Sequence, residues 1–327
     1  MANDVEKKTD RNLAMELVRV TEAAALAASH WIGKGKKNEA DGAAVEGMRR
    51  AFDSVGIDGT VVIGEGEMDE APMLYIGEKV GAGGPEMDIA VDPLEGTTLT
   101  AKAGPNALAV LALAEKGKFL HAPDVYMDKI AVGGGLPQGV VDLDASVIEN
   151  LRNLAKAKKC DISELTACVL DRDRHQEIIA KCREVGARVM LLSDGDVFGV
   201  MATTMPETGV DIYLGWGGAP EGVLAAAALR CVDGQMQGRL IYEDDTQMQR
   251  AIAMGLADPH QKLSITDMAS GDVMFSATGV TGGTMLKGVR RMPHAAVTHS
   301  IVMRSKSGTV RFVEAFHNFD MKTWTPS

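Results

Sequence analysis

The sequence predicts an α/β protein with two domains, each built on a parallel or mixed sheet with helices on its faces. With 327 residues, the chain is long for a single hydrophobic core. Short apolar runs alternate with helical spacings, most regularly beyond Leu165, and this alternation is typical of α/β folds. Glycine is abundant, with 36 residues, and aromatic residues make up only 4%. This composition suits tight turns between strands and helices.

The first part of the chain predicts two helices followed by strands. Apolar residues spaced three and four apart predict a helix over Leu13–His30, and a second helix is expected over Asp41–Phe52. The stretch Gly33–Lys37 separates them. Strands of one sheet are predicted over Gly59–Ile63, Asp88–Val91, Asn106–Glu115 and Lys129–Val132.

The composition changes around Gly133–Gly139, which predicts one domain over residues 1–140 and a second over 141–327. The second domain alternates strands and helices. Its predicted strands are Leu165–Leu170, Arg188–Leu192 and Val210–Leu214, and its predicted helices are Gln176–Val185 and Gly222–Val232. The tail from Val273 predicts strands over Ser300–Arg304 and Thr309–Glu314, joined by a turn at Ser305–Gly308.

Charge and cysteine usage narrow the class of protein. The net charge of −11 disfavours partners such as nucleic acid or an acidic membrane, and a phosphate ligand would need local cations. The cysteines lack CxxC spacing, which predicts reduced thiols in a cytoplasmic protein. Residues 1–12 lack the apolar region of a signal peptide, and the apolar stretch 23–29 is shorter than the roughly 20 residues of a membrane helix.

Two acidic clusters, Gly64–Glu70 and Asp92–Thr97, each follow a short β-branched run. Burying these carboxylates without compensation would cost several kcal/mol each. A hard divalent cation such as Mn²⁺ or Mg²⁺ is the natural compensation, because it takes oxygen ligands and leaves positions for phosphate. The pattern therefore predicts a metal-dependent phosphatase.

In the cluster Asp92–Thr97, the proline is expected to end the strand because it cannot donate to a ladder, which leaves Asp92 at the sheet edge. Asp92 and Glu95 could then face one cation. Gly96 allows a ligand to approach the backbone, and Thr97 offers a hydroxyl and an N–H to a phosphoryl oxygen. For this motif alone, an Asx-type turn with solvated acids is the alternative.

Five further acids are candidates. Glu65 comes directly after its strand and is expected to be a metal ligand, whereas Asp69 or Glu67 could act as a base toward water. Asp41 lies in the first turn of its predicted helix, and Glu221 follows a Gly-Gly-Ala-Pro helix entrance. Asp41 and Glu221 could be metal ligands, or they could only complement the helix dipole.

Cationic and short acidic residues follow two strands of the second domain. Arg172 and Arg174 could grip a phosphate, with a solvated pair as the alternative. Asp194 and Asp196 follow the next strand, at the side of an open α/β sheet where ligands bind, and could accept hydrogen bonds from sugar hydroxyls. Of the seven scattered histidines, only His175 is expected near a site. No P-loop and no convincing dinucleotide fingerprint is present.

Three motifs in order, Glu65–Glu78, Asp92–Thr97 and Gly217–Gly222, resemble those of class II fructose-1,6-bisphosphatases of the GlpX type. The similarity runs from about Leu13 to Phe312. This family is part of the lithium-sensitive, divalent-metal sugar and inositol phosphatases. The resemblance implies their layered α/β sandwich of two domains.

The resemblance also implies a role for each site residue. The metal ligands would be Asp41, Glu65, Asp92, Glu95 and Glu221. The substrate contacts would be Glu95, Gly96, Thr97, Tyr126, Arg172, Asp173, Arg174, Asp194, Gly195, Asp196 and Gly218. Thr97 would orient or deprotonate the attacking water, and Asp69 would support catalysis near a second metal.

The expected reaction is hydrolysis of the 1-phosphate of fructose 1,6-bisphosphate, a step of gluconeogenesis, by a cytoplasmic homo-oligomer (dimer or tetramer) that uses Mn²⁺ or Mg²⁺. A sedoheptulose 1,7-bisphosphatase, or an enzyme that accepts both sugars, is the nearest alternative. An inositol monophosphatase is disfavoured because the arginine pair suggests a second phosphate. A non-catalytic sugar-phosphate sensor would be expected to have lost an acid or Thr97, and every such position is filled.

Overall fold

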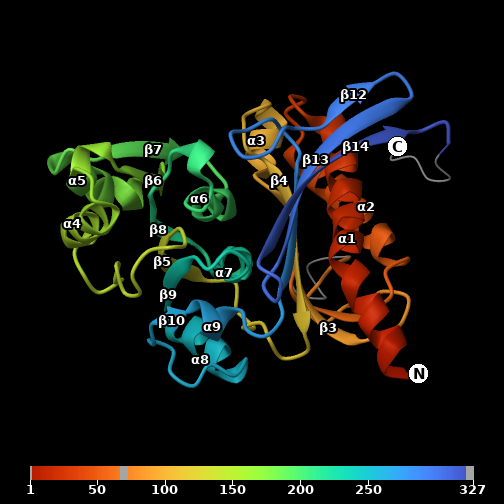
Figure 1. The fold of residues 1–327 in the computed structure, drawn as a ribbon, viewed down its shortest axis with the longest axis horizontal. Helices are drawn as coiled ribbons and strands as arrows, with labels where there is room; N and C mark the ends of the chain where they lie inside the picture. The colour runs from red at the N-terminus through yellow and green to blue at the C-terminus, as the bar shows by residue number, and fades with distance from the viewer. Residues whose placement is uncertain (1, 67–72, 322–327) are drawn as a thin grey trace. The chain divides into compact units, whose positions relative to one another are not determined.

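The computed structural model describes the backbone of residues 2–66 and 73–321, and the side chains from residue 12 onward within these ranges. The chain forms two compact units (Figure 1), Met1–Lys118 with Gly271–Ser327, and Phe119–Ser270. This division differs from the predicted boundary near residue 140, because the last strands of the chain return to the first sheet. Within the described ranges, no helix combines the length and apolar character needed to cross a membrane.

The first unit contains an eight-stranded mixed sheet in the order β12-β13-β11-β4-β3-β1-β2, with β14 paired to β13. Its strands are β1 (Asp58–Ile63), β2 (Lys79–Val80), β3 (Glu86–Glu95), β4 (Leu108–Glu115), β11 (Met274–Gly279), β12 (Arg290–Met292), β13 (Ala295–Arg304) and β14 (Thr309–Asn318). β1 and β3 run parallel, whereas the other pairs are antiparallel. The predicted hairpin near the end of the chain is confirmed by β13 and β14.

Helices α1 and α2 pack beside this sheet (Figure 1). The helices of the unit are α1 (Ala2–Ala28), the 3₁₀ turn η1 (Ser29–Trp31), α2 (Lys37–Phe52) and α3 (Thr97–Lys102). Leu17 and Ala24 of α1 and Met48 of α2 are fully buried in the core, which confirms the helical spacing read from the sequence. Asp41 is the fifth residue of α2, so the expectation that it lies in the first turn is wrong.

Pro93 does not end its strand, as had been expected. β3 continues to Glu95, and the register against β4 shifts between Asp92, which pairs with Val110, and Glu95, which pairs with Leu108. A proline is tolerated within a strand at such an irregularity, because the missing N–H is not needed there. Asp92 therefore lies inside the sheet, between β1 and β4, and not at its edge.

The second unit contains a six-stranded mixed sheet in the order β10-β9-β5-β8-β6-β7. Its strands are β5 (Tyr126–Val132), β6 (Thr166–Leu170), β7 (Arg188–Leu192), β8 (Ile212–Gly218), β9 (Gln235–Ile241) and β10 (Leu263–Ser264). The strand predicted over Lys129–Val132 belongs to this sheet rather than to the first one. The hydrophobic pattern marks a strand but does not say which sheet it joins.

Helices cover both faces of the second sheet, with α4 and α5 on one face and α6 and α7 on the other (Figure 1). The helices and 3₁₀ turns are α4 (Val147–Lys158), η2 (Ile162–Glu164), η3 (Asp173–His175), α5 (Gln176–Glu184), α6 (Asp196–Ala202), η4 (Pro206–Thr208), α7 (Ala219–Arg230), α8 (Asp245–Ala253) and α9 (Ile265–Met268). Ile130, Val169 and Leu214 point to the face of α4 and α5, where they join an apolar core. The alternate residues of β5, Lys129 among them, point to the other face.

Candidate active site

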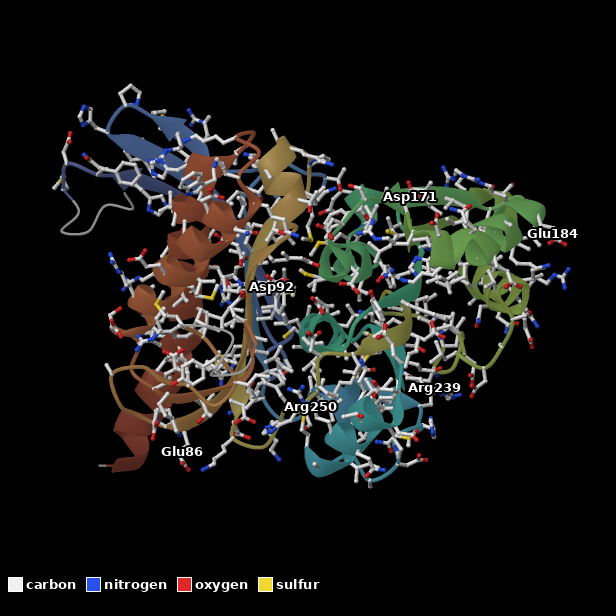
Figure 2. The ribbon with its side chains drawn as sticks, turned by 180° about the vertical axis from the view of Figure 1, so that it is seen from behind. Glu86, Asp92, Asp171, Glu184, Arg239 and Arg250 are labelled. Carbon is white, nitrogen blue, oxygen red and sulfur yellow. The ribbon has the colours of Figure 1, made fainter. Side chains whose placement is uncertain are left out.

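The end of β3 carries the acidic motif of the first unit, and Figure 2 labels Asp92 on this strand. Asp92 is half-buried, and its Oδ1 accepts a hydrogen bond from the Leu94 N–H at 3.1 Å. Glu95 ends the strand and is only 4% exposed. Gly96 adopts φ = 86°, a conformation that suits glycine, and Thr97 begins α3. The turn thus brings two carboxylates and a hydroxyl to the carboxyl end of β3.

Glu65 follows β1 at the same end of the strands, because β1 runs parallel to β3 with Ile63 in register with Ala90. The Glu65 N–H donates to the Leu74 carbonyl at 3.0 Å, which anchors the start of the loop. Asp41 lies on α2, which packs against α3 and β3. Its side chain is half-buried, and burial raises the pKa of the Asp41 carboxyl group.

The chemistry of these donors fits a hard divalent cation, because all are carboxylates and three lie at or near the carboxyl ends of the parallel strands β1 and β3. Within residues 2–66 and 73–321, however, no three histidine, cysteine, aspartate or glutamate side chains are grouped closely enough to hold a metal ion. The metal role of Asp41, Glu65, Asp92, Glu95 and Glu221 therefore stays a prediction. Asp69 and Glu67, the candidate bases, lie outside the described residues.

In the second unit, Lys129 of β5 is the centre of a buried polar cluster. Its side chain is 1% exposed, and its ammonium group donates to the Asp196 carboxylate and, at 2.7 Å, to the Gly218 carbonyl. Asp196 is the first residue of α6, and Gly218 directly precedes α7. A buried charge is costly unless it is paired and hydrogen-bonded. The cluster meets this requirement, and it brings together two predicted substrate-binding residues.

The glycine pair before α7 leaves space for two carboxylates. A Cβ atom on Gly217 would lie 1.8 Å from Asp196 Oδ2, and one on Gly218 would lie 1.9 Å from Glu221 Oε2. Neither carboxylate could keep its place beside a larger residue. The Gly-Gly-Ala-Pro-Glu-Gly motif therefore makes room for the acids in addition to opening a helix, with Pro220 in the first helical turn as predicted.

Glu221 lies in the first turn of α7. Burial and the nearby negative charge of Asp196 raise the pKa of Glu221 to about 7, and the positive charge of Lys129 acts in the opposite direction. Glu221 therefore ionises less readily than an ordinary glutamate, and additional positive charge nearby would favour its ionised form. These surroundings suit a residue that binds a cation.

Arg172 and Asp194 lie near each other at the ends of neighbouring parallel strands, β6 and β7. The Arg172 guanidinium donates to the Ser193 carbonyl at 2.7 Å, and it stands 3.7 Å from the Asp194 carboxylate. Gly195 follows with φ = 88° and precedes the first residue of α6. The predicted residues Arg172, Asp194 and Gly195 thus form one continuous edge of the second sheet.

Arg174 points to different neighbours from Arg172. Its guanidinium lies over the Tyr126 ring, 4.7 Å from the ring centroid, and donates to the Trp216 carbonyl at 3.0 Å. Stacking of this kind fixes the plane of an arginine. Arg174 and Tyr126, both predicted to bind substrate, are brought together, whereas Asp173 between the arginines is exposed.

His175 is fully buried and has a structural role in the described contacts. The Trp216 N–H donates to Nε2 at 2.8 Å, so Nδ1 carries the proton and donates to the Leu170 carbonyl at 2.8 Å. Burial is the main reason that the pKa of His175 is lowered. A neutral imidazole therefore links the end of β6 to β8.

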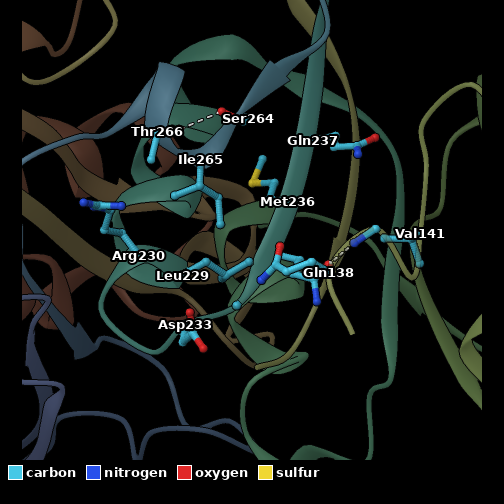
Figure 3. A pocket seen from close by; sticks show the side chains of 13 residues that line it. Gln138, Val141, Leu229, Arg230, Asp233, Met236, Gln237, Ser264, Ile265 and Thr266 are labelled. Atoms are coloured by element: carbon cyan, nitrogen blue, oxygen red, sulfur yellow. Dashed lines mark hydrogen bonds between the residues drawn. The ribbon is translucent and has the colours of Figure 1, made fainter. Parts of the chain in front are cut away.

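Two cavities lie within the second unit. One of about 470 Å³ is lined by Asp128, Leu143, Asn150, Arg174, Lys181 and Trp216, among others. The other, of about 300 Å³, is shown in Figure 3 and has a mixed lining, in which the polar side chains include Arg230, Asp233, Gln235, Gln237, Ser264 and Thr266. Among the predicted substrate-binding residues, Arg174 is the one that lines the first cavity.

Lys129 is the residue that the sequence reasoning missed. A lysine directly before the apolar run Ile130–Val132 could have indicated a buried ion pair, because lysine is almost never fully buried unless it is paired. Its partner Asp196, however, lies 67 positions further along the chain, so the pairing could not be read locally.

Comparison with known proteins identifies the family. Residues 11–317 match the protein family described as "Bacterial fructose-1,6-bisphosphatase, glpX-encoded". The chain is 49% identical over 327 residues to "Fructose-1,6-bisphosphatase 1 class 2" of Escherichia coli strain K12, covering 95% of this chain and 97% of that protein. The same identity and coverage hold for "Fructose-1,6-bisphosphatase class 2" of Escherichia coli O6:H1 and of Shigella flexneri. With this identity over nearly its whole length, the chain belongs to the glpX-encoded family of bacterial fructose-1,6-bisphosphatases.

Proposed function

We propose that the protein hydrolyses the 1-phosphate of D-fructose 1,6-bisphosphate to fructose 6-phosphate and phosphate, a reaction of gluconeogenesis. The observation that carries this proposal is the 49% identity to class 2 fructose-1,6-bisphosphatases over 95% of the chain. The presence of every expected acid, and of Thr97, supports an active enzyme rather than a sensor.

The metal-binding residues in this proposal are Asp41, Glu65, Asp92, Glu95 and Glu221, which would hold Mn²⁺ or Mg²⁺. Such an ion, when bound, supplies positive charge to phosphoryl oxygens and lowers the pKa of a bound water. Support comes from the all-carboxylate donor set and from the raised pKa of Glu221, whose ionised form a nearby cation would stabilise.

Thr97 and Asp69 are the proposed catalytic residues. Thr97 starts α3 directly after the buried Glu95 and the left-handed Gly96, so its hydroxyl is held by a turn with little freedom. From this place it would orient the attacking water toward phosphorus and donate to the charge that develops on the phosphoryl oxygens. Asp69 would accept a proton from that water.

The substrate contacts are proposed for three sets of residues. Arg172 and Arg174, with Tyr126, would bind the 6-phosphate, because guanidinium groups match phosphate geometry. Asp194 and Asp196 would accept hydrogen bonds from sugar hydroxyls. Glu95, Gly96 and Thr97 would contact the reacting phosphate, and Asp173, Gly195 and Gly218 would shape the rest of the site.

The proposal includes a homo-oligomer in the cytoplasm. Exposed apolar side chains on β14, Phe312 at 48% and Phe316 at 67%, support self-association. The four cysteines are free thiols, which suits a reducing compartment. Self-association is tested by size-exclusion chromatography with light scattering on the wild type and on a Phe312→Ser/Phe316→Ser variant. The variant should elute as a smaller species.

The position of hydrolysis is tested by ³¹P NMR of the reaction mixture. The spectrum should show fructose 6-phosphate and inorganic phosphate as the only products. Accumulation of fructose 1-phosphate would contradict the proposed orientation of the substrate. In parallel reactions, kcat/KM for fructose 1,6-bisphosphate should exceed that for sedoheptulose 1,7-bisphosphate; the reverse order would assign the enzyme to the longer sugar.

A further inference from the structure

Lys129 lies among glycines of the second unit, and a Cβ atom on Gly222 would lie 3.5 Å from the Lys129 Cδ atom. Lys129 pairs with Gly215 on β8 and with Gly238 on β9, so neither cross-strand neighbour has a side chain. A Cβ atom on Gly217 would come within 2.9 Å of the Lys129 ammonium group. The surroundings therefore accommodate one long side chain that extends toward α6 and α7.

The Lys129 ammonium group joins two segments that each carry predicted substrate contacts. One is the start of α6, where Asp196 accepts its hydrogen bond and is only 6% exposed. The other is the residue before α7, where the Gly218 carbonyl accepts at 2.7 Å. The contact with Asp196 is buried and the one with Gly218 is partly buried, and charge-assisted hydrogen bonds in such surroundings are strong and geometrically specific.

We propose that Lys129 is a positioning residue, which holds Asp196 and Gly218 in the arrangement that binds the sugar part of the substrate. With 1% of its side chain exposed, Lys129 acts through these residues and does not contact the substrate. The inference rests on the proposed function, because that function gives Asp196 and Gly218 their roles.

Replacement of Lys129 by methionine keeps most of the side-chain volume and removes the charge. The Asp196 carboxylate then stays buried without its cation, which is strongly unfavourable, so it should leave its place. The Gly218 carbonyl loses the same donor. Both segments should therefore become more mobile, and the sugar should bind more weakly.

Lys262 provides a matched control in the same unit. Its ammonium group also joins two acceptors, Asp142 at 2.6 Å and Asp144 at 2.9 Å, and neither is a predicted substrate residue. A Lys262→Met variant loses two ion pairs whose carboxylates are exposed, so it reports the effect of removing a lysine charge from this unit without leaving a buried carboxylate unpaired. It should leave sugar binding unchanged.

Hydrogen exchange of the protein without metal or substrate is the first test. In Lys129→Met, the amides of residues 194–198 and 216–221 should exchange at least about tenfold faster than in wild type, as expected when a buried charge loses its partner. Lys262→Met should not change either segment. Unchanged protection of both segments in Lys129→Met would overturn the proposal.

Binding of fructose 6-phosphate, measured by calorimetry, is the second test. Lys129→Met and Asp196→Asn should each raise the dissociation constant about tenfold or more. If Lys129 acts through Asp196, the double variant should bind no more weakly than Asp196→Asn alone. Losses that multiply in the double variant would show an independent role and would contradict the inference.

If Lys129→Met does not fold, the Gly217→Ala variant replaces it, because its Cβ atom would displace Asp196 from the ammonium group. Faster hydrogen exchange at residues 194–198 is then expected, and unchanged exchange would overturn the proposal.

The wild type also tests the proposed function itself. If it binds no fructose 6-phosphate and hydrolyses no fructose 1,6-bisphosphate, the proposed function fails, and the exchange experiment still decides whether Lys129 positions the two segments.

Discussion

At the scale of single residues, both units use glycine to place carboxylates. Gly96 takes a left-handed turn directly after the buried Glu95, and Gly217 and Gly218 leave the space that Asp196 and Glu221 fill. A side chain at these positions would strain the turn or displace the acid. The glycines in the motifs are therefore requirements of the acidic site rather than signs of flexibility.

Thr97→Ala tests the proposed catalytic hydroxyl. Loss of a group that acts mainly in the transition state should lower kcat by a factor of about 10² to 10³, with little change in KM. Thr98→Ala is the matched control, because Thr98 is also half-buried and lies next to Thr97 in α3. Steady-state kinetics with fructose 1,6-bisphosphate decide the question: equal changes in kcat and KM would argue against the role.

His175 makes stability depend on pH. Its folded-state pKa is lowered by burial, so below the unfolded-state value of about 6.5 the unfolded chain binds the proton more readily. The stability that His175 contributes is present above this value and is lost as pH falls. The free energy of unfolding should therefore be lower at pH 5.5 than at pH 7.5.

The measurement is urea unfolding of wild type and His175→Gln at both pH values. The wild type should lose its advantage over the variant at pH 5.5, because the variant has no imidazole to protonate. A difference that is equal at pH 5.5 and 7.5 would show that the buried imidazole does not govern the acid sensitivity.

At the scale of elements, the spacing of hydrophobic residues correctly predicted most of the helices and strands proposed from the sequence. It failed where the pairing between strands determines how far an element extends or which sheet it joins. Pro93 was expected to end its strand, but the register shift against β4 lets β3 continue to Glu95. The site residues in the loops after the strands could be predicted from local motifs. The Lys129–Asp196 contact could not, because it joins two elements that are distant in the sequence.

Helix α2 contains two glycines with opposite predicted effects. A Cβ atom on Gly47 would lie 2.8 Å from the Ala23 carbonyl oxygen on α1, whereas one on Gly42 meets nothing within 4 Å. Gly42→Ala should therefore raise the free energy of unfolding by about 0.5–1 kcal/mol through helix propensity. Gly47→Ala should lower it, because α1 and α2 must move apart. Chemical denaturation measures both, and stabilisation by Gly47→Ala would contradict the close packing of α1 and α2.

At the scale of the whole molecule, the second unit is an insertion in the first. The chain enters it at Phe119 and leaves it at Ser270. Phe119 and Ala269 form an antiparallel bridge, and the Leu120 N–H donates to the Met268 carbonyl at 2.9 Å. The predicted division at residue 140 instead cuts between β5 and the strands that pair with it, because composition along the chain does not reveal that a later segment returns to an earlier sheet.

This organisation predicts that residues 119–270 fold alone. The fragment has its own core and its two ends meet, so it should show a cooperative thermal transition by circular dichroism. A fragment of residues 141–327 should not, since it lacks β5, which pairs with β8 and β9. An unfolded 119–270 fragment, or a cooperative 141–327 fragment, would contradict the assignment of the units.

The most direct test of the central claim is phosphate release from fructose 1,6-bisphosphate by the protein after metal removal with a chelator, followed by addition of Mn²⁺ or Mg²⁺. We expect no turnover in the metal-free protein, strong turnover when either ion is restored, and a loss of at least about 10²-fold in Glu95→Gln. Turnover that persists without metal, or folded protein that stays inactive with both ions, would contradict the proposed metal-dependent bisphosphatase.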